Sequence, residues 1–422
     1  MPIETEKKQE KVILVAVSQS DGDDTEDSVR ELGELVNTAG AEVAGVVIQN
    51  RERIHPGTYV GTGKIEEIAE LIDITHSDGI VCDDELSPAQ MKNLEGILHC
   101  KVMDRTMVIL DIFAGRASTS EGKLQVELAQ LRYRLNHLTG MGREMSRLGG
   151  GIGTRGPGEK KLEIDRRLIR DRISILKSEL KDVVRHREIN RKQREKNHVP
   201  VAAIVGYTNA GKSTLLNVLT GADVLEEDMV FATLDPTTRV LKLDNKQEIL
   251  LTDTVGFIRK LPHHLIDAFR STLEEAKYAD FIIHVVDSSN PEADKQMHIV
   301  YETLRNLGVE GKKILTLFNK SDLRREHLMD SDEFFVNPLH DFMADETLEI
   351  SAAKGEGLDE VKEKLASFLR DDKIYVERVI PFGMAGLIQN IRKTGELKEE
   401  SYEADGIHIK AYVTMETYGK LP

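Results

Sequence analysis

Eight residues in the middle of the chain, Gly206-Tyr-Thr-Asn-Ala-Gly-Lys-Ser213, match the phosphate-binding pattern G-x-x-x-x-G-K-[ST] at every fixed position. Residues 201–205 before them read as a short buried strand, and residues 214–219 after them begin a helix. Glycines let the loop turn its N–H groups toward phosphate oxygens, and the helix N-terminus adds partial positive charge. The pattern therefore predicts a nucleoside triphosphate site. The expected binding residues are Gly206, Asn209, Ala210, Gly211, Lys212 on the β- and γ-phosphates, Ser213 on Mg²⁺, and Thr214.

The base is predicted by Asn319-Lys-Ser-Asp322, an N-K-x-D element that follows the apolar stretch 314–318. The Asp322 carboxylate can accept hydrogen bonds from N1–H and the 2-amino group of guanine, neither of which adenine offers. Two charge-assisted bonds of about 1.5–3 kcal/mol each favour GTP by several orders of magnitude. We expect Asn319 to tie the base to the phosphate loop and Lys320 to lie along the ring.

A second guanine element is Ser351-Ala-Ala-Lys354, which follows the stretch 347–350. Here we expect a backbone N–H, assigned to Ala352, to contact guanine O6, with Ser351 and Ala353 beside it.

Two further elements resemble the switches that sense a γ-phosphate. Asp253-Thr-Val-Gly256 follows a predicted strand at 248–252, and we expect Asp253 to hold Mg²⁺ through water and the Gly256 N–H to bind the γ-phosphate. Upstream, Phe231-Ala-Thr-Leu-Asp-Pro-Thr-Thr238 offers three threonines. Thr233 is our choice for the Mg²⁺ and γ-phosphate ligand, with Phe231 beside it and Thr237 and Thr238 as alternatives. The predicted catalytic set is Lys212, Thr233 and Gly256, and the predicted metal set is Ser213, Thr233 and Asp253.

Two residues bear on the rate of hydrolysis. Phe257 follows Gly256 where many GTPases place a water-orienting glutamine, so we expect slow turnover that needs a group from a partner or another part of the chain. Asn209 occupies the loop position where some GTPases bind K⁺ between the phosphates, and the alternative is an ordinary loop residue.

Composition and charge limit the class of protein. The 422 residues are 40% hydrophobic and 31% charged, as in a soluble protein of several domains. No apolar run approaches the ~20 residues of a membrane span, and the first residues do not resemble a secretory signal. With two isolated cysteines, we expect a cytoplasmic protein, with partial membrane association left open.

The net charge of −16 argues against nonspecific nucleic-acid binding, and we expect no DNA partner. However, residues 116–198 contain 21 Lys or Arg and 11 Asp or Glu, a net of +10, so the rest carries −26. This basic segment is either a polyanion contact or a solvated helical face.

We predict an α/β chain of four parts. Residues 1–115 alternate strands and helices, as in a small domain with a parallel sheet. Residues 116–198 carry two leucine-rich heptad stripes, which predict an antiparallel helical hairpin. Residues 199–370 form the GTP-binding domain, with a mixed, mostly parallel sheet. Residues 371–422 read as a small C-terminal α+β unit with a hairpin turn at Asp405-Gly406.

The predicted hairpin tip, residues 140–158, holds eight glycines and three arginines, Arg143, Arg147 and Arg155. Such a loop could conform to irregular RNA, or it could be flexible and undecorated. Its Gly151-x-Gly153-x-x-Gly156 does not follow a strand, so we reject a dinucleotide site. Gly61-Thr-Gly-Lys64 reads as a turn entering a helix rather than half of a phosphate loop.

Taken together, these motifs make the chain resemble the HflX family of translational GTPases over nearly its whole length. The resemblance also rests on His55–Lys64, Glu85–Gln90, Asp104–Thr106, Asp111–Ala117, Lys123–Leu131 and Gly149–Glu159. It implies binding to the large ribosomal subunit and ribosomal RNA, with a part in splitting or rescuing stalled ribosomes under stress such as heat. We expect a monomer. The alternatives are a regulatory GTPase directed at a protein and a separate adenine-nucleotide activity at Gly61–Lys64.

Overall fold

The structure is a computed structural model of the chain. The residues it describes are 9–19, 24–148, 157–196, 199–221, 231, 236–245, 247–260, 262, 265, 275–330, 339–371 and 373–422. They form two compact units. The first comprises Met1–Arg185, Met229–Leu234 and Arg259–Arg270, and the second comprises His186–Asp228, Asp235–Ile258 and Ser271–Pro422. Two short segments of the predicted GTP-binding domain thus group with the N-terminal part.

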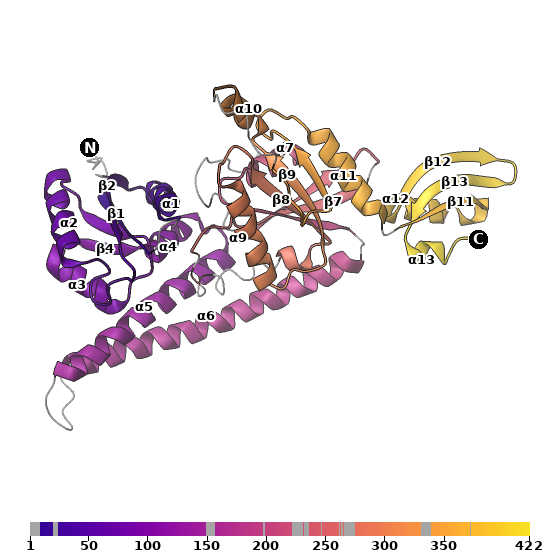
Figure 1. Cartoon of the computed structure of the whole chain (residues 1–422). Coiled ribbons are helices and arrows are strands. Elements are labelled where there is room, and N and C mark those ends of the chain that lie inside the picture. Colours follow the sequence, from indigo (N-terminus) through magenta and orange to yellow (C-terminus); the bar gives the residue numbers. More distant parts are fainter. Residues whose placement is uncertain are drawn as a thin grey trace, which may run out of the picture. The chain divides into compact units, whose positions relative to one another are not determined.

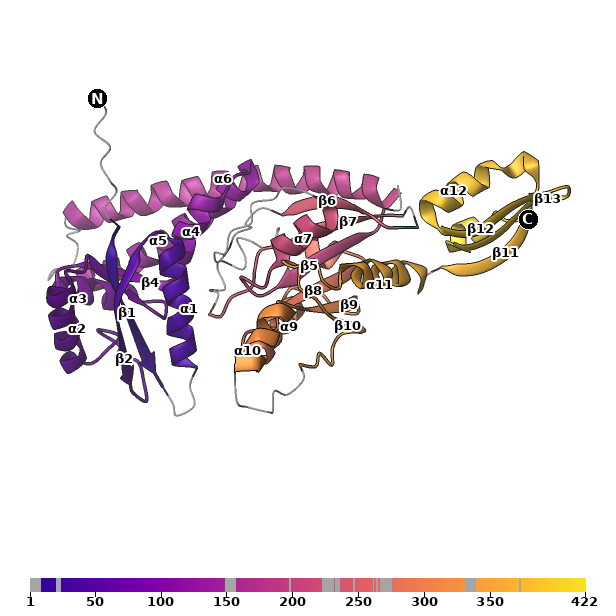
Figure 2. The same ribbon diagram turned by 90° about the horizontal axis from the view of Figure 1, so that it is seen from above.

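The first unit contains a four-stranded parallel sheet in the order β2-β1-β3-β4. In Figures 1 and 2, α1 and α4 lie on one face of this sheet and α2 and α3 on the other. Strand β1, one of the two inner strands, is buried on both faces because helices cover both sides of the sheet. The elements are β1 Lys11–Ser18, α1 Thr25–Thr38, β2 Glu42–Asn50, α2 Thr62–Thr75, β3 Gly79–Cys82, α3 Pro88–Leu98, β4 Lys101–Asp104 and α4 Arg105–Arg116.

Local sequence explains where these helices begin. Ser87 caps α3 through a reciprocal pair of hydrogen bonds with Gln90, followed by a proline in the first turn. The Asp104 side chain accepts a hydrogen bond from the Met107 N–H and so caps α4. Gly61 precedes α2, and Lys64 pairs with Glu67 one turn later. The Gly61–Lys64 segment is therefore a helix start, as predicted.

Two long helices, α5 Ser120–Leu148 and α6 Pro157–Lys196, follow the sheet. Leu128, Ile173 and Leu176 form their buried seam, with partly buried Leu124, Leu131, Leu135, Ile169 and Leu180 packed against it. Arg172 donates to Glu127 at 2.7 Å, and Arg166 donates to the Leu138 carbonyl, which establishes an antiparallel pair. The heptad stripes predicted this packing. The Gly-rich stretch 149–156 lies outside the described residues.

The second unit contains a six-stranded sheet in the order β10-β9-β8-β5-β7-β6, in which only the pairing of β6 with β7 is antiparallel. Its core includes side chains of β5, β7, β8 and β9 packed against α7 and α11. The elements are β5 Val201–Gly206, α7 Lys212–Thr220, β6 Thr237–Lys242, β7 Glu248–Asp253, β8 Phe281–Asp287, α9 Ala293–Asn306, β9 Lys313–Asn319, α10 Ser321–Asp330, β10 Glu346–Glu349 and α11 Leu358–Asp371.

The C-terminal part is an antiparallel sheet in the order β11-β13-β12. The hairpin turn consists of Ala404 and Asp405, because Glu403 pairs with Gly406. The turn is therefore one residue earlier than the predicted Asp405-Gly406 pair. Gly406 is needed as a strand residue, since a Cβ there would lie 2.9 Å from the Ile380 carbonyl oxygen. The elements are β11 Ile374–Ile380, a 3₁₀ turn Phe382–Met384, α12 Gly386–Thr394, β12 Glu396–Glu403, β13 Gly406–Val413 and α13 Met415–Tyr418.

The predicted fold class is confirmed: an N-terminal α/β domain, a helical hairpin, a mostly parallel GTPase sheet and a small C-terminal sheet. Within the described part of the chain, no helix has the length and apolarity that crossing a membrane requires.

We expect Gly79→Ala to destabilise the protein by about 1–3 kcal/mol. A Cβ at this position would lie 2.4 Å from the Lys101 carbonyl oxygen, so the pairing of β3 with β4 would have to shift. The measurement is the denaturant midpoint of the full chain. Gly96→Ala on α3 is the matched control, because a Cβ there meets nothing within 4 Å. That change should stabilise by about 0.5–1 kcal/mol, and a midpoint lowered equally by both changes would contradict the steric explanation.

Candidate functional site

Strand order brings the four predicted motifs to one edge of the six-stranded sheet. All pairings among β10, β9, β8, β5 and β7 are parallel. The segments that follow β5, β7, β9 and β10 therefore leave from the same edge of the sheet. Those segments are the phosphate loop, the Asp253 turn, the Asn319–Asp322 element and the Ser351–Lys354 element. Ligands bind at this carboxyl edge in open α/β sheets.

The phosphate loop depends on glycine at both of its ends. A Cβ on Gly206 would lie 2.2 Å from the Val285 carbonyl oxygen. Gly211 has a φ of +90°, and a Cβ there would lie 2.3 Å from Asn319 Nδ2. Asn209 also adopts the left-handed conformation, with a φ of +60°. These constraints shape the loop that turns from β5 into α7.

Lys212 and Ser213 occupy the first turn of α7. The Lys212 ammonium is buried and donates to the Tyr207 carbonyl at 2.7 Å. Burial, only partly offset by the charge of Asp253, lowers the pKa of Lys212 to about 8. A nucleotide phosphate would supply the charge that this cation needs.

A hydroxyl and a carboxylate meet where the sequence predicts Mg²⁺. Ser213 Oγ donates to Asp253 Oδ2 at 2.8 Å, and the Asp253 side chain is fully buried. Hydroxyl and carboxylate oxygens are the ligands that Mg²⁺ prefers, so this donor set fits the ion. The sequence prediction pairs these two residues across 40 positions, and the structure places them in direct contact.

Gly256 lies directly on the phosphate loop. A Cβ on Gly256 would be 2.9 Å from Thr208 Cα and 3.0 Å from Lys212 Nζ, so only glycine fits. Phe257 N–H donates to the Gly206 carbonyl, and the Phe257 carbonyl accepts from Thr208 N–H. The Phe257 ring is 2% exposed. This buried ring contributes packing, and it offers no group that could orient a water.

Asn319 connects three loops of the site. Its Nδ2 donates to the Ala210 carbonyl at 2.9 Å, and its Oδ1 accepts from the Ala352 N–H at 2.9 Å. The link to the phosphate loop agrees with the predicted role of Asn319. The Ala352 N–H, however, is used by Asn319 in this structure. Its contact with guanine O6 stays a prediction that requires this N–H to be shared or released.

The predicted base-recognition residue Asp322 is oriented by Ser351. Ser351 Oγ donates to Asp322 Oδ1 at 2.8 Å. Burial would raise the pKa of Asp322, but this hydrogen bond and two backbone N–H groups outweigh it, so the pKa is lowered. The carboxylate is therefore held ionised, the form that accepts two hydrogen bonds from guanine.

One residue of this region was missed by the sequence analysis. Asp287, the last residue of β8, forms an ion pair with Lys320 at 2.8 Å. Lys320 also has a φ of +60°, so this pair holds a strained backbone. An acidic residue at the end of an apolar stretch was the available signal.

The structure does not test every predicted ligand. Thr233 lies outside the described residues. Phe231 is 3% exposed and belongs to the first compact unit, so its predicted place beside the nucleotide stays a prediction. The alternatives Thr237 and Thr238 begin β6, and Thr238 shares a hydrogen bond of 3.0 Å with Thr252. Thr214 is the third residue of α7, and Ala353 lies in the turn that follows Ser351.

Comparison with known proteins identifies the family of the chain. Residues 26–114 match the family described as GTP-binding GTPase N-terminal, and residues 116–194 match GTP-binding GTPase Middle Region. Residues 201–320 match the family described as 50S ribosome-binding GTPase. The chain is 62% identical to GTPase HflX of Lacrimispora saccharolytica over 99% of this chain and 97% of that protein. The chain belongs to the HflX family of GTPases.

Other proteins are less similar to this chain. GTPase HflX of Caldanaerobacter subterraneus subsp. tengcongensis is 46% identical over 99% of this chain and 94% of that protein. GTPase HflX of Escherichia coli is 45% identical over 77% and 76%. A crystal structure of a Sulfolobus solfataricus GTP-binding protein with GDP is 27% identical, with a TM-score of 0.44, over 85% of this chain and 98% of that one. As an HflX-family protein, this chain binds guanine nucleotides and hydrolyses GTP.

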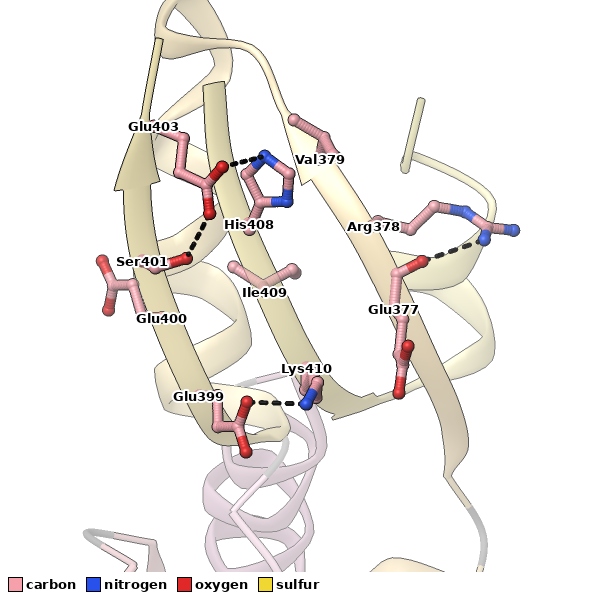
Figure 3. Close-up of a pocket in the computed structure, with 10 residues that line it drawn as sticks. All are labelled: Glu377, Arg378, Val379, Glu399, Glu400, Ser401, Glu403, His408, Ile409 and Lys410. Atoms are coloured by element: carbon pink, nitrogen blue, oxygen red, sulfur yellow. Dashed lines mark hydrogen bonds and ion pairs between the residues drawn. The ribbon is translucent and has the colours of Figure 1, made fainter. Parts of the chain in front are cut away.

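A separate hollow lies on the open face of the C-terminal sheet (Figure 3). Its charged groups pair with one another: Lys410 with Glu399 at 2.7 Å, and His408 with Glu403 at 3.7 Å. A hydrogen bond to Asp405 raises the pKa of His408. Glu403, Asp405 and His408 could approach one ion, but these exposed ion pairs explain their proximity without one. The predicted nucleotide motifs contribute no residue to this hollow.

We expect Asp322→Asn to weaken GTP binding by about 10²–10⁴-fold, since two charge-assisted hydrogen bonds are lost. The asparagine amide could instead donate to the 2-oxo group of xanthine, so affinity for xanthosine triphosphate should rise. Equilibrium binding of both nucleotides tests this. Asp359→Asn, an exposed aspartate of α11, is the control and should change neither affinity. Unchanged GTP binding in Asp322→Asn would exclude the proposed base contact.

The pKa of Lys212 also predicts the pH dependence of nucleotide affinity. Bound phosphates favour the charged ammonium and raise its pKa above 8. Affinity for GTP should then be full below pH 8 and fall by up to about tenfold per pH unit above it. Titrations between pH 7 and 9.5 measure this. In Lys212→Arg, the side chain stays charged throughout, so the same decline there would assign it to another group.

Proposed function

We propose that this GTPase binds the large ribosomal subunit and uses its GTP cycle to split or rescue stalled ribosomes under stress. Three observations support the proposal. The chain belongs to the HflX family, its residues 201–320 match a family described as 50S ribosome-binding GTPase, and its helical hairpin is basic within an acidic protein. The basic character of the hairpin can be assigned to individual side chains of α6.

Exposed cations form a stripe on α6. At about 100° per residue, the five members fall within an arc of about 80°, beside the seam that packs on α5. They are Arg167, Arg170, Lys177, Lys181 and Arg185. The acidic residues in the same stretch, Asp171, Glu179 and Asp182, lie on other faces of the helix. We call these five cations the α6 basic stripe. Its spacing suits the regularly placed phosphates of an RNA backbone.

The residues of the nucleotide site give a mechanism for the switch. Lys212 holds the β- and γ-phosphates, and the Gly256 N–H reports the γ-phosphate to the segment that follows it. Ser213 and Asp253 would hold Mg²⁺, with Thr233 as the proposed third ligand. The ion would neutralise phosphate charge during hydrolysis. Asp322 and Asn319 select guanine and hold the base near the loop.

The catalytic set is incomplete in this chain, because Phe257 stands where a water-orienting side chain would be required. We therefore propose that hydrolysis is slow until a partner or another part of the chain supplies the missing group. A K⁺ ion held by Asn209, a monomeric state and a cytoplasmic location are part of the same proposal.

Co-sedimentation with purified large ribosomal subunits tests ribosome binding. Binding should need GTP and weaken steeply between 50 and 200 mM salt, and subunits should stimulate GTP turnover. Arg170→Gln should reduce the salt slope of binding by about one. Arg172→Gln is the matched control on the same helix, because Arg172 is paired with Glu127 and lies off the α6 basic stripe.

Two outcomes would contradict the proposal. Absence of stimulation would exclude the ribosome-linked function. Salt-insensitive binding that is indifferent to Arg170→Gln would favour a regulatory GTPase whose hairpin contacts a protein.

A further inference from the structure

The end of β8 lies between the phosphate loop and the guanine elements. In the sheet order β10-β9-β8-β5, strand β8 separates β5, which leads into the phosphate loop, from β9, which ends at Asn319 (Figure 1). Asp287 is the last residue of β8 and pairs in register with Asn319. The four nucleotide motifs contain neither Asp287 nor the two serines that follow it, Ser288 and Ser289. All of these residues belong to the second compact unit.

The main chain is fixed on both sides of Lys320. The Asn319 carbonyl accepts hydrogen bonds from the Ser288 N–H at 2.9 Å and from Ser288 Oγ at 2.7 Å. On the other side, the Ser321 N–H donates to the Ile350 carbonyl at 3.1 Å. Lys320 itself has a φ of +60°, a left-handed conformation that a lysine rarely adopts. The segments that follow β8 and β10 therefore set the point from which the Lys320 side chain starts.

Asp287 fixes the other end of this side chain. Its Oδ2 lies 2.8 Å from the Lys320 ammonium. Its Oδ1 accepts from the Ser289 N–H at 3.0 Å and from Ser289 Oγ at 2.6 Å, so the carboxylate cannot rotate without losing hydrogen bonds. The side chains of Asp287 and Lys320 are 15% and 22% exposed. Salt screens a partly buried pair of this kind less than a surface pair. Lys320 is thus held at its main chain and at its ammonium.

The stem of Lys320 extends from the end of β9 toward the end of β8. The residue predicted to read the base, Asp322, is held on the opposite side, because Ser351 after β10 donates to it at 2.8 Å. A nucleotide that joins the phosphate loop after β5 to Asp322 passes over the ends of β8 and β9, where the stem lies. Because the ammonium is paired with Asp287, the stem offers methylene groups to the base.

A restrained lysine is a better contact for a ligand than a mobile one. A lysine has many rotamers, and a ligand that immobilises it loses affinity through the conformational entropy of the side chain. Asp287 restrains Lys320 before a nucleotide binds. Binding then proceeds without that entropic loss, so removal of the restraint should weaken binding.

We propose that Asp287 is a positioning residue for guanine nucleotides, whose carboxylate holds the Lys320 side chain in the conformation in which its stem packs along the base. Ser289 keeps that carboxylate oriented. The inference rests on the predicted place of Lys320 along the ring, and it adds a contribution from β8 to base binding. Asp287 acts through Lys320, so its loss weakens contacts to the base and leaves the phosphate loop and Asp322 unchanged.

The test is the affinity of the full chain, with Mg²⁺, for GDP, IDP and inorganic tripolyphosphate, each measured by competition with a fluorescent GDP analogue. IDP lacks the 2-amino group that Asp322 would bind, and tripolyphosphate has no base. Asp287→Asn should weaken GDP and IDP binding equally, by roughly threefold to tenfold. The GDP-to-IDP ratio and the affinity for tripolyphosphate should stay unchanged. The asparagine oxygen can still accept from Ser289, so the turn is kept.

Three further variants sharpen the test. Asp287→Glu keeps the charge and should restore most of the GDP affinity, because the Lys320 stem can adjust to the longer side chain. Asp294→Asn makes the same chemical change at an exposed aspartate in the first turn of α9, and it should alter none of the three affinities. In a Lys320→Ala background, Asp287→Asn should have little further effect, because both changes remove one interaction.

Three results would overturn the proposal. Unchanged or tighter GDP binding in folded Asp287→Asn would show that the ion pair does not prepare Lys320 for the base. A changed GDP-to-IDP ratio, or an equal loss of tripolyphosphate affinity, would assign Asp287 a general role in the stability of the site. Additive effects in the double variant would mean that Asp287 acts through a group other than Lys320.

Discussion

The two hydrogen bonds of the Asn319 side chain hold the nucleotide site together. Its amide nitrogen is bonded to Ala210 in the phosphate loop and its amide oxygen to Ala352 in the last guanine element. The close approach of Gly211 follows from the same side chain. Because Asn319 ends β9, the register of the central strands sets the distance between the phosphate and base positions. The phosphate loop and the last guanine element are therefore joined through one buried amide.

Charge is distributed so that each part of the molecule has a distinct electrostatic character. The chain is acidic as a whole, yet α6 presents a stripe of exposed cations. In the N-terminal domain, a buried arginine and a lysine from a distant segment balance adjacent carboxylates. On the C-terminal sheet, exposed charges neutralise one another. These arrangements favour a polyanion at the hairpin and an internal contact at the end of β3.

Local patterns predicted much of the fold. The heptad stripes on α5 and α6 form a buried seam, as their spacing predicts. The phosphate loop and the Asn319–Asp322 element follow strands as expected, because each motif is contiguous in sequence and its chemistry requires a fixed local geometry. Residues paired over long separations were harder to predict. Asp287, the partner of Lys320, has no motif around it, and the use of the Ala352 N–H by Asn319 depends on loops from different strands.

The amino-acid sequence was sufficient to establish a GTP site, its guanine preference and a basic helical hairpin, since these depend on short motifs and helical periodicity. Only the tertiary structure shows which residues, far apart in the sequence, form buried ion pairs with one another. Asp83, Arg105 and Lys260 are separated by up to 177 positions, and none belongs to a nucleotide motif. Burial makes their pairing necessary, because an unpaired charge in a protein interior is far less stable than one in water. That requirement places the segment after Gly256 against the N-terminal domain.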